Sequence, residues 1–412
     1  MDGQNLKFVI VGHVDHGKST LIGRLLYDTD SLSTDKIEEI KKTSWDLGRE
    51  IEFAYLLDHL EEERQQGITI ETTQVFFKTG KREYVIIDAP GHVEFVKNMI
   101  TGASQAEAAV LIVDVKEGVR EQTRRHAYIL SLLGLKQVIV VLNKMDLVDY
   151  SQKKFEEVKK DIEQFLASIE IKPLFYIPIS AIKGRNIAGK SEQTDWYKGP
   201  TFLESLDMLK NRPLSQDEPL IFPAQDIYKM DGKRITVGRI EAGAVKQGQT
   251  VRILPANYTA RINAIEKYME DTNSASAGES IGITTEEPVF INRGDILCMP
   301  DKEPVLTDKF SANIFWMANQ DFEMDQKVVI KCATQETACR IKCIKKRINS
   351  STLEVIQENA DTLKNLEVGE VVIKTKRPIA IKAFNDIQEL GRFVFVQDEN
   401  VCAGGIISEV IE

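Results

Sequence analysis

Cysteine is scarce in this chain, which has five thiols among its 412 residues. They are Cys298, Cys332, Cys339, Cys343 and Cys402, an odd number confined to the last third of the sequence. This distribution argues against a disulfide framework and is typical of reduced thiols in the cytosol. The middle three lack CxxC spacing and a neighbouring histidine, so we expect ordinary thiols there and not a metal cluster.

Long hydrophobic runs are also missing. No apolar stretch approaches the roughly 20 residues that a membrane span needs, so we expect no membrane anchor. The first residues run directly into an expected strand, so we expect no secretory signal and a cytoplasmic location. Positive charge is in deficit, with 53 Lys and Arg against 63 Asp and Glu and a net charge of −10. This balance disfavours a general nucleic-acid coat but allows a local basic patch.

The first half of the chain has the pattern of an α/β domain. Continuous apolar runs, as expected of strands covered on both faces, occupy 8–11, 84–87, 110–113 and 138–142. The segment 155–169 has apolar residues at i, i+3 and i+4 spacing, which predicts a helix packed on the sheet. Together these elements predict a doubly wound α/β domain over residues 1–212.

The second half has a β pattern. Turn signals such as Asp231-Gly232 and Ala277-Gly278 separate short apolar segments, and no helical period continues through them. We expect one β-barrel over 213–303 and another over 304–412. Strands expected in the latter lie at 328–330, 371–373 and 392–396.

The sequence GHVDHGKS at 12–19 fits the phosphate-loop pattern G-x-x-x-x-G-K-[ST] between an expected strand and an expected helix. Lys18 would reach the β- and γ-phosphates, and the Ser19 hydroxyl would ligate Mg²⁺. The pair His13 and His16 resembles a metal site, but its loop is committed to phosphate. We expect nucleotide contacts from Gly12, His13, Val14, Asp15, His16, Gly17, Lys18, Ser19 and Thr20.

Three further residues are candidates for contacts with Mg²⁺ and the γ-phosphate. Asp88 ends an apolar run, where its carboxylate can hold the metal directly or through water. Gly91 leaves its backbone N–H for the γ-phosphate. Thr69, in the sequence GITI at 67–70, would sense Mg²⁺ and γ-phosphate together. A threonine in a β-rich stretch is by itself more often structural, and the position of Thr69 between two nucleotide motifs favours the functional role.

The sequence NKMD at 143–146 indicates guanine as the base. The Asp146 carboxylate can accept from the ring N–H and the exocyclic amine of guanine, a pair that adenine lacks. Asn143 and Lys144 would brace this loop and cover the base. In the sequence SAI, formed by Ser180, Ala181 and Ile182, the backbone of Ser180 and Ala181 would meet the O6 atom of guanine. The chain is therefore predicted to bind GTP and Mg²⁺ and to hydrolyse GTP.

His92 is the candidate for positioning the attacking water, because it directly follows the glycine expected to sense the γ-phosphate. A local pairing of this histidine with a carboxylate is the alternative. The residues expected to act in catalysis are Lys18, Thr69, Gly91 and His92.

The motifs GHVDHGKS, GITI and DAPGH, followed by two barrels, resemble the translation-factor class of GTPases, the group of elongation factor Tu and elongation factor 1-alpha. Other stretches are similar to the GTPase subunit of heterodimeric sulfate adenylyltransferase, or ATP sulfurylase. They are LLYDT at 25–29, AYLLD at 54–58, GVREQTRRH at 118–126, NKMDLVDYS at 143–151 and FWMA at 315–318. Other features instead resemble an elongation factor. They are His13, His16, PAQDIY at 223–228 and LGRF at 390–393.

The second resemblance implies that GTP hydrolysis on this chain drives adenylyl sulfate synthesis from ATP and sulfate on a partner adenylyltransferase subunit. The sequence contains one set of nucleotide motifs, in agreement with adenylyl transfer on another chain. The resemblance also implies that Val14 and Ile68 form a hydrophobic gate in front of His92, with simple packing as the alternative.

Two other functions stay open. An elongation factor that delivers aminoacyl-tRNA needs a basic surface, for which Lys342, Lys345, Lys346 and Arg347 are candidates. The same run could be a solvated strand face. A regulatory module whose GTP state gates assembly is the third function. We expect sulfate activation, with tRNA as the alternative partner.

Overall fold

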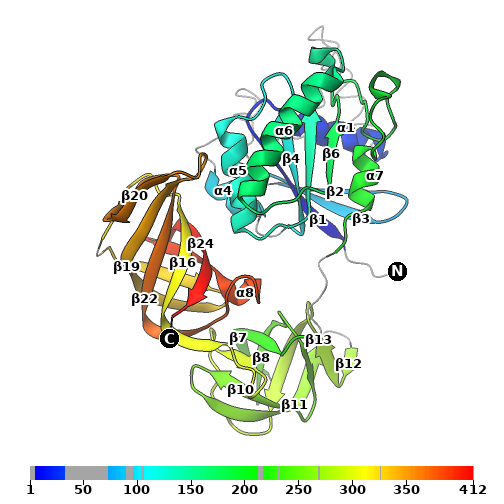
Figure 1. Cartoon of the computed structure of the whole chain (residues 1–412). Coiled ribbons are helices and arrows are strands. Elements are labelled where there is room, and N and C mark those ends of the chain that lie inside the picture. Colours follow the sequence, from blue (N-terminus) through cyan, green and yellow to red (C-terminus); the bar gives the residue numbers. More distant parts are fainter. Residues whose placement is uncertain are drawn as a thin grey trace. The chain divides into compact units, whose positions relative to one another are not determined.

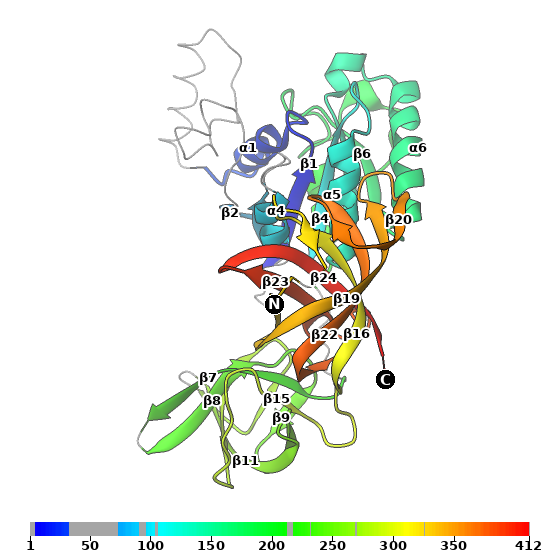
Figure 2. The same cartoon turned by 90° about the vertical axis from the view of Figure 1, so that its left-hand side faces the viewer.

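The computed structural model describes residues 5–32, 73–89, 96–103, 106–211, 217–230, 232–267, 270–324 and 326–411. Figures 1 and 2 show the chain in two views. Residue contacts divide it into two compact units, one of Met1–Arg212 with Ser350–Thr352 and one of Pro213–Asn349 with Leu353–Glu412. The two boundaries between the three domains expected from the sequence stay predictions.

The first unit is built on one sheet, which has six strands in its described part. The strands are parallel except at one edge, where β2 runs antiparallel to β3. In spatial order they are β2 (Thr73–Lys78), β3 (Glu83–Asp88), β1 (Leu6–Gly12), β4 (Ala108–Asp114), β5 (Val138–Asn143) and β6 (Phe175–Pro178). The four strands expected from continuous apolar runs are confirmed, and β4 and β5 are buried along their whole length.

Helices cover both faces of this sheet. One face is covered by α1 (Lys18–Asp28) and α7 (Phe202–Asp207), whose leucines share a buried cluster with β1. Figure 2 shows α6 (Gln152–Ser168) on the side of the sheet opposite α1. The other described helices are α4 (Val96–Ala103), α5 (Glu121–Leu132), η3 (Met145–Val148) and η4 (Glu192–Thr194). The doubly wound α/β fold is confirmed.

Four strands of the sheet end in the residues that matter for the site. Gly12, Asp88, Asp114 and Asn143 are the last residues of β1, β3, β4 and β5. Because these strands are parallel, their carboxyl ends meet at one edge of the sheet, and Asp114 lies directly beside Asn143. Ligands of open α/β sheets bind at this edge.

The second unit contains two closed antiparallel barrels. The first barrel closes where β10 pairs with β11, and its interior holds apolar side chains such as Phe222, Ile253 and Leu297. Its strands are β7 (Ile221–Met230), β8 (Lys233–Arg239), β9 (Ala244–Lys246), β10 (Thr250–Leu254), β11 (Tyr258–Lys267), β12 (Glu270–Thr272), β13 (Ser274–Ser276), β14 (Ser280–Thr285) and β15 (Ile296–Cys298).

The second barrel closes where β18 pairs with β19, around a core that includes Phe310, Trp316 and Phe395. Its elements are β16 (Val305–Trp316), β17 (Phe322–Glu323), β18 (Val328–Cys332), β19 (Gln335–Asn349), β20 (Val355–Ala360), β21 (Thr362–Leu363), β22 (Glu367–Ile381), α8 (Gln388–Gly391), β23 (Arg392–Gln397) and β24 (Asn400–Val410). The expected strands are confirmed, and the short helix α8 was not foreseen.

All five cysteines are free thiols. Four of them are buried, whereas Cys343 on β19 is exposed and lies opposite Val372 of β22. Among the described helices, none is long and apolar enough to cross a membrane.

Candidate nucleotide site

The loop that joins β1 to α1 requires glycine at two positions. A Cβ atom on Gly12 would lie 2.4 Å from the carbonyl oxygen of Ile112, a backbone atom that cannot move aside. Gly17 has φ +92°, and a Cβ there would lie 2.4 Å from Asn143 Nδ2. These contacts explain why only glycine fits at the two glycine positions of the phosphate-loop pattern.

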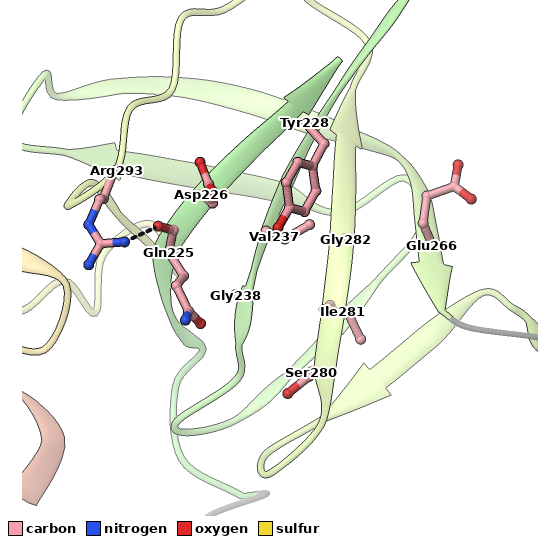
Figure 3. A pocket seen from close by; sticks show the side chains of 10 residues that line it. All are labelled: Gln225, Asp226, Tyr228, Val237, Gly238, Glu266, Ser280, Ile281, Gly282 and Arg293. Carbon is pink, nitrogen blue, oxygen red and sulfur yellow. Dashed lines mark hydrogen bonds between the residues drawn. The ribbon is translucent and has the colours of Figure 1, made fainter. Parts of the chain in front are cut away.

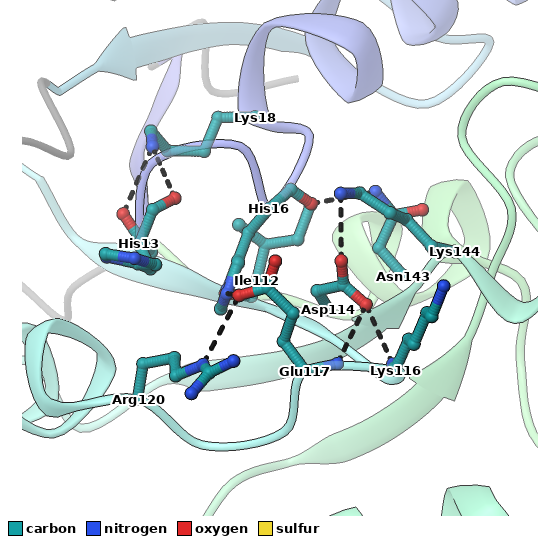
Figure 4. Close-up of polar contacts among 11 residues, drawn as sticks. His13, His16, Lys18, Ile112, Asp114, Lys116, Glu117, Arg120, Asn143 and Lys144 are labelled. Atoms are coloured by element: carbon teal, nitrogen blue, oxygen red, sulfur yellow. Dashed lines mark hydrogen bonds and ion pairs between the residues drawn. The ribbon is translucent and has the colours of Figure 1, made fainter. Parts of the chain in front are cut away.

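Lys18 is buried at the start of α1 and points back into the loop. Its Nζ donates to the carbonyl oxygens of Gly12 and His13, both at 3.1 Å (Figure 4). Burial lowers the pKa of Lys18 to about 8, and the nearby Asp88 carboxylate acts against this shift. Ser19 and Thr20 follow in the first turn of the helix and are half-buried. The loop thus presents a cation and two hydroxyls at a helix N-terminus, an arrangement that suits an anion.

Of the two loop histidines, His16 faces the sheet and His13 is half-buried beside it. The His16 ring is fully buried, with Nδ1 3.4 Å from the carbonyl oxygen of Ile112 and Nε2 3.7 Å from Glu117 Oε2. The rings of His13 and His16 meet edge to face at 5.2 Å. Burial lowers the pKa of His16 to about 4, so this ring is neutral at physiological pH. His16 therefore supports the loop by packing, and Val14 and Asp15 form the exposed turn above it, Asp15 with φ 61°.

A magnesium ion would find hard oxygen donors here. Asp88 is buried at the end of β3, where it lies opposite Ile10 of β1, two residues before the phosphate loop begins. Magnesium is usually held by one or two protein oxygens together with substrate phosphates, and the Asp88 carboxylate and Ser19 hydroxyl fit that description. In the described part of the chain, no group of three His, Cys, Asp or Glu residues could hold a metal alone.

The base-binding motifs form one hydrogen-bonded unit. The Asn143 side chain accepts from the N–H of Ala181 and donates to the carbonyl of His16, both at 2.9 Å. Ser180 Oγ donates to Asp146 Oδ1 at 2.5 Å and so fixes the carboxylate expected to bind guanine. Ile182 follows with an exposed side chain. The structure thus brings together the sequence motifs at 12–19, 143–146 and 180–182.

Sequence reasoning missed two features of this site. It gave Ser180 a backbone role, whereas its hydroxyl orients Asp146. It also missed Asp114, whose Oδ2 lies 2.8 Å from Lys144 Nζ. An acidic residue that ends a buried strand beside the NKxD strand is the signal that could have identified Asp114.

Four residues to which the sequence assigned roles lie outside the described residues. They are the two switch residues Thr69 and Gly91, the water-positioning candidate His92 and the gate residue Ile68.

Three family models match the chain in the order of its expected domains. Elongation factor Tu GTP binding domain matches residues 4–216, Elongation factor Tu domain 2 matches 233–298, and GTP-eEF1A C-terminal domain-like matches 309–408. The first model alone covers more than half of the chain, and the set accounts for both barrels.

Elongation factor 1-alpha of Methanosphaerula palustris is 38% identical over 98% of this chain and 97% of the relative. The protein of the same name from Methanopyrus kandleri is 40% identical over 99% and 98%. A solved structure, sup35 complexed with GMPPNP, is 24% identical and covers 100% of this chain and 95% of that chain, with a TM-score of 0.47.

The prediction of a sulfate adenylyltransferase subunit was wrong, because relatives with 36–40% identity over nearly the full chain are named elongation factor 1-alpha. Several residues of the misleading stretches are buried. Thr123 and His126 of the sequence at 118–126 are buried, as are Phe315 and Trp316, and Trp316 belongs to the core of the second barrel. Such residues report on folding of the shared architecture and not on the choice of partner.

Proposed function

Because this chain belongs to the translation-factor class of GTPases, the family of elongation factor Tu and elongation factor 1-alpha, we propose that it delivers aminoacyl-tRNA as an elongation factor. The observation that carries the proposal is similarity over the whole length, barrels included, to relatives named for elongation. The GTPase domain supports GTP as the bound nucleotide. A protein with this function would work in the cytoplasm.

We assign the nucleotide contacts as follows. The phosphates would lie along the loop at 12–19, with Lys18 moving from the loop carbonyls to the β- and γ-oxygens. Asp146, held by Ser180, would accept from guanine. When Mg²⁺ is bound between Ser19 and Asp88, it would neutralise charge on the β- and γ-phosphates.

Hydrolysis would need orientation more than strong base chemistry. His92 would align a water for in-line attack on the γ-phosphorus, and GDP would leave as the phosphorus–oxygen bond breaks. Gly91 and Thr69 would hold the γ-phosphate from the other side. We retain these three roles as proposals.

The first barrel has a pocket that suits the end of a tRNA. It has a volume of about 360 Å³ and is lined by Gln225, Asp226, Tyr228, Val237, Gly238, Glu266, Ser280, Ile281, Gly282 and Arg293 (Figure 3). Two glycines line it, Gly238 and Gly282, where an added Cβ would collide with the protein, 2.3 Å from the Pro223 carbonyl oxygen and 2.5 Å from Ile235 respectively.

The polar groups around this pocket fit a nucleoside. Arg293 donates to the carbonyl of Gln225 at 3.0 Å, which holds its guanidinium at the rim. The Tyr228 ring is 52% exposed and available for stacking, and the Glu266 carboxylate can accept from a ribose hydroxyl or an exocyclic amine. We propose that the terminal adenosine shared by all mature tRNAs binds here.

A row of cations on the second barrel supports the same partner. Lys309 of β16 lies opposite Lys374 of β22, which in turn lies opposite Arg340 of β19. Like charges directly across a sheet are destabilising, and among the described residues the one ion pair to this row comes from Asp308, 2.6 Å from Lys374 Nζ. A phosphate backbone would neutralise it.

The basic run expected from the sequence contributes less to this surface. Lys346 pairs with Glu370 at 3.2 Å, and Arg347 pairs with Glu367 at 3.3 Å. Lys345 donates to Ser311 Oγ at 3.2 Å. Lys342 is exposed and lies on the same strand as Arg340.

Protection of the aminoacyl ester tests the proposal. The chain loaded with a non-hydrolysable GTP analogue should slow spontaneous deacylation of aminoacyl-tRNA, whereas the GDP-loaded chain should not. Glu266→Ala should weaken this protection by about tenfold with nucleotide affinity unchanged, because it removes one charged hydrogen-bond acceptor. Glu270→Gln, an exposed position outside the pocket, is the matched control. Equal deacylation with and without the GTP form would refute tRNA delivery.

A further inference from the structure

The Asp114 carboxylate, at the end of β4, makes two different sets of contacts. It is 2% exposed and lies in register with Asn143, the first residue of the base-binding motif. Its Oδ1 accepts the backbone N–H groups of Lys116 at 2.8 Å and Glu117 at 3.3 Å. Its Oδ2 lies 2.8 Å from Lys144 Nζ (Figure 4). One carboxylate therefore closes the turn after β4 and also holds the lysine of the base loop.

Lys144 is held in an unfavourable backbone conformation. Its φ of 62° is left-handed, a region that non-glycine residues adopt at a cost. The loop on either side is fixed, because the Asn143 carbonyl accepts from the N–H of Val115 and the Met145 N–H donates to the carbonyl of Ile179. With both ends of the loop fixed, the direction of the lysine side chain depends on what its ammonium group binds.

The Asp114 carboxyl group is ionised at neutral pH. Burial by itself raises the pKa of the Asp114 carboxyl, but the bond from Lys144 and the two backbone N–H donors outweigh it and bring the pKa below its usual range. A buried carboxylate that remains charged keeps its cation, because separating the two would leave a buried charge unpaired.

We propose that Asp114 is a positioning residue for guanine nucleotides, which fixes the ammonium of Lys144 so that the lysine's methylene chain covers one face of the base. A free lysine samples many rotamers, and ordering it on binding opposes affinity. In this chain that ordering precedes nucleotide arrival. The inference rests on guanine-nucleotide binding at this site and is independent of tRNA delivery.

A double-mutant cycle on the full chain tests the proposal. Asp114→Asn keeps an oxygen for the backbone donors but removes the charge, and Lys144→Met keeps an aliphatic side chain without the ammonium. Each substitution should speed dissociation of ribose-labelled GDP about tenfold, the size expected for one charge-assisted hydrogen bond. In the Lys144→Met background, adding Asp114→Asn should change the rate by less than about twofold.

Two outcomes would overturn the proposal. If Asp114→Asn speeds GDP dissociation by the same factor with and without Lys144, the carboxylate acts only by holding the turn after β4. Lys144→Met with the parent's dissociation rate would show that the lysine contributes nothing, a result that can be read even if Asp114→Asn does not fold. Asp161→Asn, which breaks the Asp161–Arg124 pair between α6 and α5, is a matched control and should leave the rate unchanged.

Inosine diphosphate separates the lysine's role from that of Asp146. Inosine lacks the exocyclic amine that Asp146 would accept from, but it offers the same ring face to Lys144. Asp114→Asn should therefore weaken GDP and IDP by the same factor. A loss restricted to GDP would mean that the substitution disturbs Asp146, and would refute positioning through Lys144.

Discussion

The side-chain amide of Asn143 donates to the carbonyl oxygen of His16 at 2.9 Å, which ties the loop that we propose selects the base to the loop that we propose holds the phosphates. The other end of the same amide accepts from Ala181 at 2.9 Å. All three groups are buried. Base and phosphate sites are therefore coupled through one side chain before any nucleotide binds.

This coupling predicts a large effect of Asn143→Asp. The carboxylate could still accept from Ala181, but its second oxygen would face the His16 carbonyl with no proton to share. A buried acceptor without a donor costs about 1–3 kcal/mol, more when charged, so GDP affinity should fall at least about tenfold. Isothermal titration would measure it, with the exposed barrel substitution Asn263→Asp as control. Parent-like affinity would show that the two loops act separately.

Asp146→Asn should change which base is bound. An amide cannot accept from both guanine donors, but its NH₂ can donate to the extra carbonyl of xanthine. We expect weaker GTP binding by about 10- to 100-fold, from one lost charged hydrogen bond, and a gain in XTP binding. Competition of GTP and XTP against labelled GDP measures both. Unaltered GTP affinity would place the base elsewhere.

Gly12→Ala and Gly80→Ala form a matched pair. The first places a Cβ 2.4 Å from a backbone oxygen, whereas the second meets nothing within 4 Å. We expect Gly12→Ala to cost about 1–3 kcal/mol as an overpacked site and to impair nucleotide binding, and Gly80→Ala to do neither. Thermal melting with and without GDP provides the comparison. Similar melting of the two variants would contradict the close approach of β1 to β4.

Burial of the His126 ring should make the folded chain less stable at acid pH. Burial, and then the charges of Lys18 and Arg125, lower its pKa to about 3, against about 6.5 in an unfolded chain. Below about pH 6.5 the histidine is therefore protonated in the unfolded chain but stays neutral in the folded chain. The free energy of unfolding should decrease as the pH is lowered, by about 2 kcal/mol at pH 5 relative to neutral pH.

His126→Gln should remove that part of the pH dependence. Urea unfolding of both proteins without nucleotide, at about pH 7 and about pH 5, measures the difference in slope. The ring has no hydrogen-bond partner for either nitrogen among the described residues, so loss of a specific bond would not mask the effect. An unchanged slope would mean that the histidine protonates within the fold.

The sequence predicted those parts of the site in which chemistry dictates the residue. Gly12, Gly17 and Lys18 could be read directly, since a phosphate loop tolerates little else. Asp114 could not be recognised from the sequence, because its contact with Lys144 depends on β4 and β5 being neighbours in the sheet. The contact of the Ser180 hydroxyl with Asp146 was missed, because a motif does not reveal whether a side chain or its backbone makes a contact.

The fold was predictable where patterns were long. The continuous apolar strands of the sheet followed from their burial on both faces, whereas α8, four residues in length, is too short to show a helical period. The partner was misjudged because it was inferred in part from residues such as His126 and Trp316, which are buried and contact the interior of their own domains, not a partner.

The burial of four of the five cysteines leaves one thiol, that of Cys343, open to selective alkylation. Burial raises the pKa of Cys298, Cys332 and Cys339 to about 12, and Cys402 is also buried, so these sulfurs resist alkylation. Cys343 is exposed on β19, the strand that carries Arg340. A maleimide fluorophore on the unaltered protein would therefore attach beside the cation row and report, without mutagenesis, on whatever binds there.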